Sequence, residues 1–207
     1  MMEHIVIYDV EIAKEVENVP NGWDNPEGMG FASAVAYDYA TDQYHFFLHK
    51  EDKPALIDLL HTKTAVTFNG IKFDSRVLLG NDRYLNPKGP TWDAQLHWGW
   101  DNIDLLQEYV KARFGDSDVG EAEARLGDSA IHDGSFSLDG LAEGTFDLHK
   151  TGHGSHAPIL YQQEKYADLL SYNLQDVRLT RKIFEFIRQY GFIVDRKSRV
   201  INISLPK

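Results

Sequence analysis

At the start of the chain, residues 4–11 read HIVIYDVE. The run of β-branched and aromatic side chains over 4–10 is typical of a buried strand. Residues two apart in a strand point to the same side, so Asp9 and Glu11 would face one point in space. A carboxylate directly after a buried run needs a partner or a metal, because an unpaired buried charge is costly. Two surface acids at the end of a strand would give the same short pattern.

A second apolar run, residues 64–68, leads into the sequence NGIKFD at 69–74. Asp74 would therefore lie at a strand-to-helix junction, on the edge of the sheet where α/β proteins bind ligands. The same aspartate is equally suited to capping the helix that begins near residue 73.

Near the end of the chain, Tyr172 and Asp176 form its only Tyr-x-x-x-Asp sequence. Positions i and i+4 lie on one face of a helix, so the phenol and the carboxylate would point together. Apolar residues flank both positions, which puts the pair near the edge of the buried face. Taken alone, the pair is also compatible with a core tyrosine beside a surface aspartate.

Together and in this order, the three motifs resemble those of the DEDD exonuclease superfamily, whose members have an RNase H-like fold. The tyrosine variant, DEDDy, matches because Ser171 occupies the position where the other variant has histidine. The sequence TFNGIKFD at 67–74 is most similar to the proofreading exonuclease domains of family B DNA polymerases and their stand-alone relatives. Residues 137–142 and Lys150 give weaker support, and the resemblance extends from residue 5 to about 190.

The resemblance implies a site with two metal ions. Carboxylates without cysteine favour hard cations with oxygen ligands, Mg²⁺ or Mn²⁺. By the resemblance, Asp9 would contact both ions, and Glu11 and Asp176 would hold the ion that activates water. Asp74 would hold the other ion, partly through water. Two ions about 3.5–4 Å apart can stabilise the attacking and leaving oxygens of a phosphoryl displacement.

The resemblance also assigns residues around the metals. Tyr172 would orient the nucleophilic water, and Asn69 and Phe73 would lie beside the terminal nucleotide of the substrate. Asp104 resembles a further family acid before a helix, but it is equally well explained as a helix N-cap, and we leave it out of the metal set.

The implied activity is a 3′→5′ exonuclease that releases nucleoside 5′-monophosphates from a single-stranded or frayed end, with DNA favoured over RNA. An RNase D-like exoribonuclease is the first alternative, because no motif here reads a 2′-hydroxyl. A catalytically silent RNase H-like binding or scaffolding module is an alternative of another class, and the complete set of acids argues against it. A bacterial or phage setting, a cytoplasmic location and a polymerase or helicase partner are compatible with such an enzyme.

The composition limits the protein classes. With 207 residues and 43% hydrophobic residues, we expect one domain with a proper core. The absence of cysteine excludes a disulfide scaffold, a thiolate zinc site and a cysteine nucleophile. No apolar run approaches the roughly 18 residues of a membrane span, and the N-terminus does not read as a signal peptide.

The formal charge of −11 argues at first against a nucleic-acid partner, because phosphates attract basic residues. The charge is uneven, however: residues 178–207 contain eight basic and two acidic residues. These basic side chains could contact a strand or form the solvated face of a last helix. Two divalent ions would add about +4 at the site. We therefore expect a weak, metal-dependent grip on a strand end.

Two other groups of residues stay open. His149, His153 and His156 could form a zinc site, but a loop with glycines would have to fix their geometry. They are better explained as lying near the substrate or in solvent. The four tryptophans could stack unpaired bases or pack within the protein; they are Trp23, Trp92, Trp98 and Trp100.

The patterns predict an α/β, RNase H-like fold with a central mixed β-sheet flanked by α-helices. We expect strands at 4–10, 31–39, 44–49 and 64–68, and helices at 54–62, 73–79, 103–114, 137–144 and, as two helices, within 157–190. Residues 85–100 would be irregular, 115–134 a mobile insertion and 192–207 a C-terminal hairpin.

Overall fold

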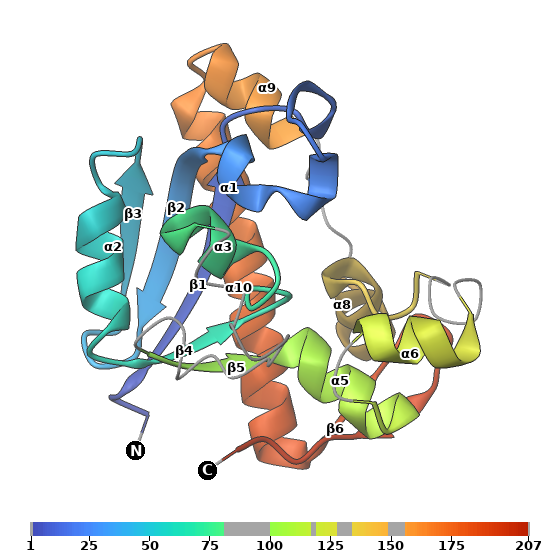
Figure 1. The fold of residues 1–207 in the computed structure, drawn as a ribbon. Coiled ribbons are helices and arrows are strands. Elements are labelled where there is room, and N and C mark those ends of the chain that lie inside the picture. Colours follow the sequence, from blue (N-terminus) through green and yellow to red (C-terminus); the bar gives the residue numbers. More distant parts are fainter. Residues whose placement is uncertain (1, 81–99, 117–118, 128–133, 149–155, 207) are drawn as a thin grey trace.

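The computed structural model describes residues 2–80, 100–116, 119–127, 134–148 and 156–206. Its centre is a five-stranded sheet with the strand order β3-β2-β1-β4-β5 (Figure 1). The strands are β1 Ile5–Ile12, β2 Phe31–Asp38, β3 Gln43–Leu48, β4 Thr64–Thr67 and β5 Asp101–Asp104. The β1–β2 and β2–β3 pairs are antiparallel, whereas β1–β4 and β4–β5 are parallel, so the sheet is mixed.

Helices cover both faces of the sheet, because β1 alternates between two apolar cores. The α-helices are α1 Pro26–Met29, α2 Lys53–Leu60, α3 Asp74–Leu79, α5 Leu105–Phe114, α6 Val119–Leu126, α8 Leu138–Phe146, α9 Ala157–Gln162 and α10 Tyr166–Tyr190. Ile5 and Ile7 pack in a core with α5, α8 and α10, whereas Val6 and Tyr8 pack in a second core with α1, α2 and α3. The expected α/β arrangement of a central mixed sheet flanked by helices is confirmed.

Most predicted elements occur within a few residues of their expected ranges. The helix predicted at 137–144 begins after Ser137, whose hydroxyl accepts a hydrogen bond from the Gly140 N–H. The predicted C-terminal hairpin consists of β6 Phe192–Val194 and β7 Val200–Asn202, paired antiparallel. The two helices predicted within 157–190 are α9 and α10. Among the described residues, no helix combines the length and apolar composition that a membrane span needs.

Three expectations differ from the structure. The first strand continues two residues beyond Val10, so both acids of the first motif lie inside it. Strand β5 was not predicted; it is a four-residue edge strand with an exposed Asp101 and no apolar run to mark it. In the described part of 115–134, helix α6 packs on α5 through the buried Ala122. Whether this segment moves stays a prediction, and the irregular structure expected at 85–99 lies outside the described residues.

The C-terminal hairpin is closely packed against α8. A Cβ atom on Gly144 would lie 2.2 Å from the backbone carbon of Asp195, so only glycine allows this approach. The adjacent Thr145 hydroxyl donates to the Val194 carbonyl (2.8 Å) and accepts from the Val194 N–H (3.1 Å). The hairpin is thereby fixed by backbone as well as side-chain contacts.

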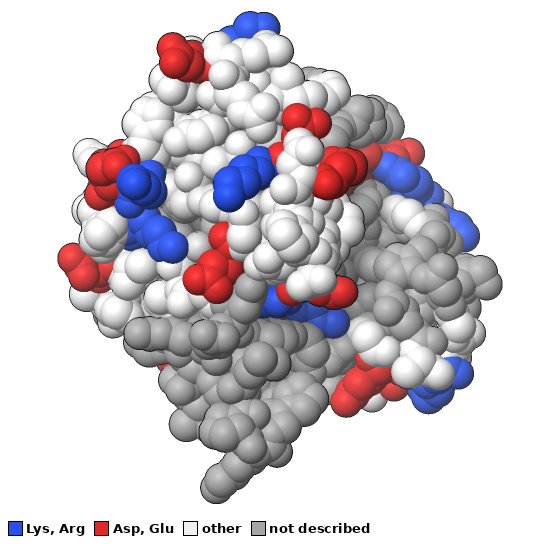
Figure 2. Space-filling view, turned by 45° about the horizontal axis from the view of Figure 1, so that its top comes forward, with Lys and Arg blue, Asp and Glu red and all other residues white. Residues whose placement is uncertain are grey.

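The basic residues of 178–207 are largely engaged within the chain. Arg181 is paired with Glu185, Arg196 with Asp139 and Glu143, and Arg199 with Asp195. Three more lie over aromatic rings: Arg178 over Tyr44, Lys182 over Phe146 and Arg188 over Phe184. On the face drawn in Figure 2, acidic and basic side chains are interspersed, and several of opposite charge lie next to one another. The expected strand contact by this basic cluster therefore gains no support.

Candidate metal centre

Strand β1 directs Asp9 and Glu11 to the side of the sheet that α10 covers. They continue the row of Ile5 and Ile7, which packs against α10, because alternate strand residues share a face. The β1–β2 register shifts between Glu11 and Ile12, so the regular strand pairing is interrupted directly after the second carboxylate. Glu11 is 7% exposed and Asp9 is half-buried, so both carboxylates are drawn away from solvent.

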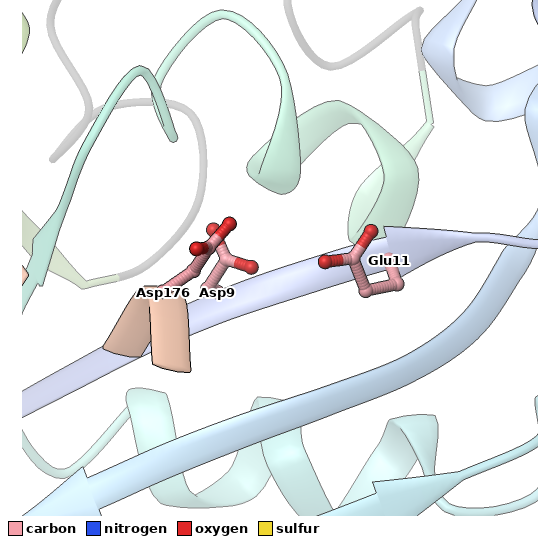
Figure 3. A group of neighbouring side chains, drawn as sticks. All are labelled: Asp9, Glu11 and Asp176. Carbon is pink, nitrogen blue, oxygen red and sulfur yellow. The ribbon is translucent and has the colours of Figure 1, made fainter. Parts of the chain in front are cut away.

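Helix α10 brings Asp176 to the same point. Carboxylate oxygens of Asp9, Glu11 and Asp176 lie within 4.8 Å of one another. In Figure 3, Asp176 projects from α10 onto Asp9, and Glu11 follows further along β1. Asp176 is 6% exposed, so the interpretation of this residue as a surface aspartate is wrong. Three carboxylates from two elements thus converge, as the sequence motifs predicted.

Asp74, at the start of α3, lines the same cavity but is not one of the three carboxylates that lie within 4.8 Å of one another. The β1–β4 pairing ends at Ile7–Val66, which leaves the N–H of Val10 facing the opening beyond β4. Asp74 Oδ1 accepts a hydrogen bond from that N–H at 2.7 Å. Phe73, not Asp74, occupies the N-cap position of α3, so the helix-capping alternative does not hold. This contact fixes Asp74 at the backbone between the two acids of β1.

The electrostatics of Asp74 reflect a crowded anionic site. Burial, with the charges of Asp104 and Asp176, raises the pKa of Asp74 to about 7, although hydrogen bonds from Val10 and from its own backbone oppose the shift. Like charges in a site with little water disfavour ionisation of one another. A divalent cation would remove this penalty, because it neutralises the charge that the acids accumulate.

Tyr172 lies one helical turn before Asp176 on α10. Burial raises the pKa of its phenol, and the charges of Asp176, Glu11 and Asp9 raise it further, together with a hydrogen bond to Asp176. The phenol therefore stays protonated at neutral pH and acts as a hydrogen-bond donor next to the carboxylates. This position agrees with the predicted pairing of Tyr172 with Asp176 on one helix face.

Asn173 is a site residue that the sequence reasoning missed. Its amide Nδ2 donates to Asp9 Oδ2 at 2.6 Å, and the residue is 0% exposed. The sequence did hold a signal, because Asn173 stands four residues from both Leu169 and Val177 in the apolar stripe of α10. A buried amide in an apolar stripe needs a polar partner. Here the partner is the carboxylate of Asp9, which belongs both to the first sequence motif and to the three-carboxylate cluster.

Replacing Asn173 by alanine should weaken metal binding by about 10- to 100-fold, the usual cost of losing a residue that orients a metal ligand. Isothermal titration with Mn²⁺ measures this directly. Gln189→Ala is the matched control, because Gln189 is exposed near the end of the same helix. Equal Mn²⁺ affinity in the Asn173→Ala variant and the parent protein would show that Asp9 needs no such support.

Asp104 has a structural position, as the N-cap alternative predicted. Its carboxylate caps α5 by accepting from the backbone N–H of Leu106 and Gln107, and it also accepts from those of Asn69 and Ile71. Asp104 thereby fixes the turn after β4, in which Asn69 takes the left-handed conformation (φ 66°) that asparagine tolerates well. Burial raises the pKa of Asp104 even though these four donors lower it.

A cavity of about 500 Å³ joins the predicted site residues. Its lining combines the carboxylates with mostly apolar walls: Asp9, Val10, Glu11, Phe68, Asn69, Phe73, Asp74, Leu106, Gly134, Phe136, Ser137, Leu138, Tyr172 and Asp176. All seven predicted catalytic and substrate residues are among them. The structure therefore brings together residues that are separated by up to 167 positions in the sequence.

The donor set fits hard divalent cations. Among the described residues, every charged group lining the cavity is a carboxylate, and oxygen ligands of this kind suit Mg²⁺ and Mn²⁺. Of the alternative zinc site, His149 and His153 lie outside the described residues, and His156 directly precedes α9. Of the tryptophans, Trp100 is 3% exposed and packs in the core, whereas Trp23 is 68% exposed; Trp92 and Trp98 lie outside the described residues.

Comparison with known proteins gives only distant similarities. No protein-family model and no curated protein matches the chain. One similar solved structure is E. coli Exonuclease I in complex with a dT13 oligonucleotide, with 14% identity and a TM-score of 0.39 over 90% of this chain and 44% of that one. Another is an ExoI/SSB-Ct complex, with 14% identity and a TM-score of 0.37 over 81% and 42%. The chain spans less than half the length of these structures, and similarity at this level does not bear on its function.

Proposed function

We propose that this chain is a metal-dependent 3′→5′ exonuclease of the tyrosine-variant DEDD type, acting on a single-stranded or frayed DNA end. The observation that carries the proposal is the convergence of Asp9, Glu11 and Asp176 within 4.8 Å, with Asp74 in the same cavity. Such a cluster is unfavourable without cations, because burial and mutual repulsion both penalise the ionised acids. The three sequence motifs account for all four acids.

Two divalent ions at this site would neutralise the phosphate charge and make water a stronger nucleophile. By the resemblance, Asp9 would contact both ions; its carboxylate lies within 4.8 Å of those of Glu11 and Asp176, and Asp74 lines the same cavity. Glu11 and Asp176 would hold one of them with Asp9, and Asp74 would hold the other. Asn173 keeps Asp9 in place through its amide.

The reaction is hydrolysis of the last phosphodiester bond. A water oxygen forms a bond to phosphorus, and the bond between phosphorus and the 3′-oxygen of the preceding nucleotide breaks. The terminal nucleotide leaves as a 5′-monophosphate, and the shortened strand keeps a 3′-hydroxyl. Tyr172 would orient the attacking water through its phenol, which burial and the neighbouring acids keep protonated.

The cavity suits one nucleotide better than a duplex end. Its volume of about 500 Å³ is within the range of pockets that enclose a single small ligand. Phe68, Phe73 and Phe136 supply apolar walls for a base, and Asn69 supplies a polar side chain. A terminal nucleotide must therefore leave its base pair before it enters, which favours single-stranded or frayed ends.

Labelled oligonucleotides test the proposal. In Mg²⁺ or Mn²⁺, a 5′-labelled strand should shorten to a ladder, whereas a 3′-labelled strand should release labelled mononucleotide at once. EDTA should stop both reactions. A parallel RNA strand distinguishes DNA from RNA preference. Release of mononucleotide from the 5′ end, or internal cuts in both strands, would contradict the proposed polarity.

Replacing Tyr172 by phenylalanine should slow single-turnover cleavage by about 10- to 100-fold and leave Mn²⁺ affinity unchanged. The phenol donates a hydrogen bond but is not among the carboxylates that bind the metals, so its loss affects the positioning of water. Tyr166→Phe, on the first turn of the same helix, is the matched control. If Tyr172→Phe reduces the cleavage rate as much as the loss of one of the metal-binding carboxylates does, the phenol does more than orient water.

A further inference from the structure

Trp23 lies beside the cavity of the candidate metal centre. Its ring centroid is 5.9 Å from that of Phe73, which lines the cavity, and the two ring planes are inclined by 52°. The Trp23 side chain is nevertheless 68% exposed. An exposed indole lacks the favourable hydrophobic free energy that burial in the core would give. Proteins use exposed aromatic rings of this kind to stack unpaired bases.

The position of Trp23 is fixed by its surroundings. It belongs to the 3₁₀ turn η2, Gly22–Asp24. The backbone N–H of Gly22 donates to the Val19 carbonyl, and that of Asp24 donates to the Asn21 carbonyl. The guanidinium of Arg76 on α3 donates to the carbonyl of Asp24 at 2.6 Å. Helix α3 is the same helix that begins after Phe73, so one element positions both rings.

The spacing of the two rings decides which base Trp23 can contact. A base stacked between two rings needs a centroid separation of about 7 Å, because stacked carbon atoms lie about 3.5 Å apart. At 5.9 Å the Trp23 and Phe73 rings are too close to admit one. A base on the exposed indole is therefore a different base from the one that contacts Phe73 inside the cavity.

We propose that Trp23 stacks the base of the second nucleotide from the 3′ end, next to the terminal nucleotide in the cavity. This inference rests on the proposed function and adds a binding position outside the metal centre. It predicts that the protein grips at least two unpaired nucleotides. The contact is to the face of the base and is therefore tolerant of sequence.

An abasic substitution tests this position in a double-mutant cycle. One oligonucleotide is complete, and the other lacks the base of the second nucleotide from the 3′ end. For removal of the first nucleotide, the parent protein should have a kcat/KM about tenfold lower on the abasic strand, the loss expected for one base–aromatic stack. Trp23→Ala should cleave the complete strand about tenfold more slowly than the parent and should no longer distinguish the two strands.

Three controls make the outcomes distinct. Trp23→Phe should restore most of the discrimination, and a base removed from the sixth nucleotide should have no effect. Tyr190→Ala removes an exposed aromatic ring (54% exposed) at the far end of α10 and should behave as the parent. If the parent cleaves neither strand, the proposed function fails. If the parent cleaves both but Trp23→Ala keeps the tenfold discrimination, only the stacking inference is overturned.

Discussion

Asp9→Asn and Asp176→Asn should each reduce metal-dependent cleavage by on the order of 10³-fold or more. Each variant removes a negative charge from the three-carboxylate cluster and keeps the shape of the side chain. A catalytic metal contributes several kcal/mol of transition-state stabilisation, and each 1.36 kcal/mol corresponds to a factor of ten in rate. Single-turnover cleavage of a 5′-labelled strand at saturating Mn²⁺ measures the loss.

Loss of folding would give the same loss of activity, and the thermal midpoint separates the two causes. Because the clustered acids repel one another without metal, both variants should unfold in EDTA at the same temperature as the parent or higher. Mn²⁺ should raise the midpoint of the parent much more than that of either variant. Asp168→Asn, an exposed acid near the start of α10, is the matched control. Full activity in both Asp9→Asn and Asp176→Asn would exclude this cluster as the catalytic centre.

More of the candidate site than of the fold could be predicted from the sequence. The site motifs are local, and the repeat of a strand or a helix decides which of their side chains share a face. The two-residue period of a strand put Asp9 and Glu11 on one side, and the helical period put Tyr172 and Asp176 on one face. Their convergence needed more than these periods, since it depends on α10 lying across β1. The resemblance to known exonucleases supplied that step, and carboxylate oxygens of Asp9, Glu11 and Asp176 that lie within 4.8 Å of one another agree with it.

The missed features have weak local signals. Strand β5 is polar and short, and only its parallel pairing with β4 makes it a strand. Helix α6 has little apolar content and depends on its contact with α5. The basic residues near the C-terminus had a clear sequence signal but an ambiguous meaning. Their carboxylate partners, such as Asp139 and Glu143 for Arg196, lie more than 50 residues away, so the sequence alone could not pair them.

Asp195 shows most clearly how such a distant partnership supports the fold. It is 0% exposed in the turn between β6 and β7. Its carboxylate accepts from the Tyr109 hydroxyl (2.9 Å), the Arg199 Nε (2.6 Å) and the backbone N–H groups of Lys197 and Arg199. It therefore joins the hairpin to α5. Burial opposes ionisation, but the hydrogen bonds from Arg199 and Tyr109 outweigh it and lower the pKa of Asp195.

Asp195→Asn should lower the free energy of unfolding by about 2–3 kcal/mol at pH 7, because the amide cannot accept from all of these donors. The loss is smaller than for a fully buried ion pair, since the Arg199 side chain is 34% exposed. Urea denaturation monitored by circular dichroism measures it. Asp58→Asn, which alters an exposed acid on α2, should leave the denaturation midpoint almost unchanged.

The difference in urea denaturation midpoint between the parent protein and Asp195→Asn should also depend on pH. A carboxylate whose pKa is lowered by folding stabilises the protein above its unfolded pKa, about 3.9, and this contribution is lost as the pH falls through the folded value. The asparagine variant has no group to protonate at this position. The two urea midpoints should therefore differ by a constant amount from pH 7 to pH 5 and converge below about pH 4. If the difference between the two urea midpoints stays constant or increases below about pH 4, Asp195 is not held as a buried anion by Arg199 and Tyr109.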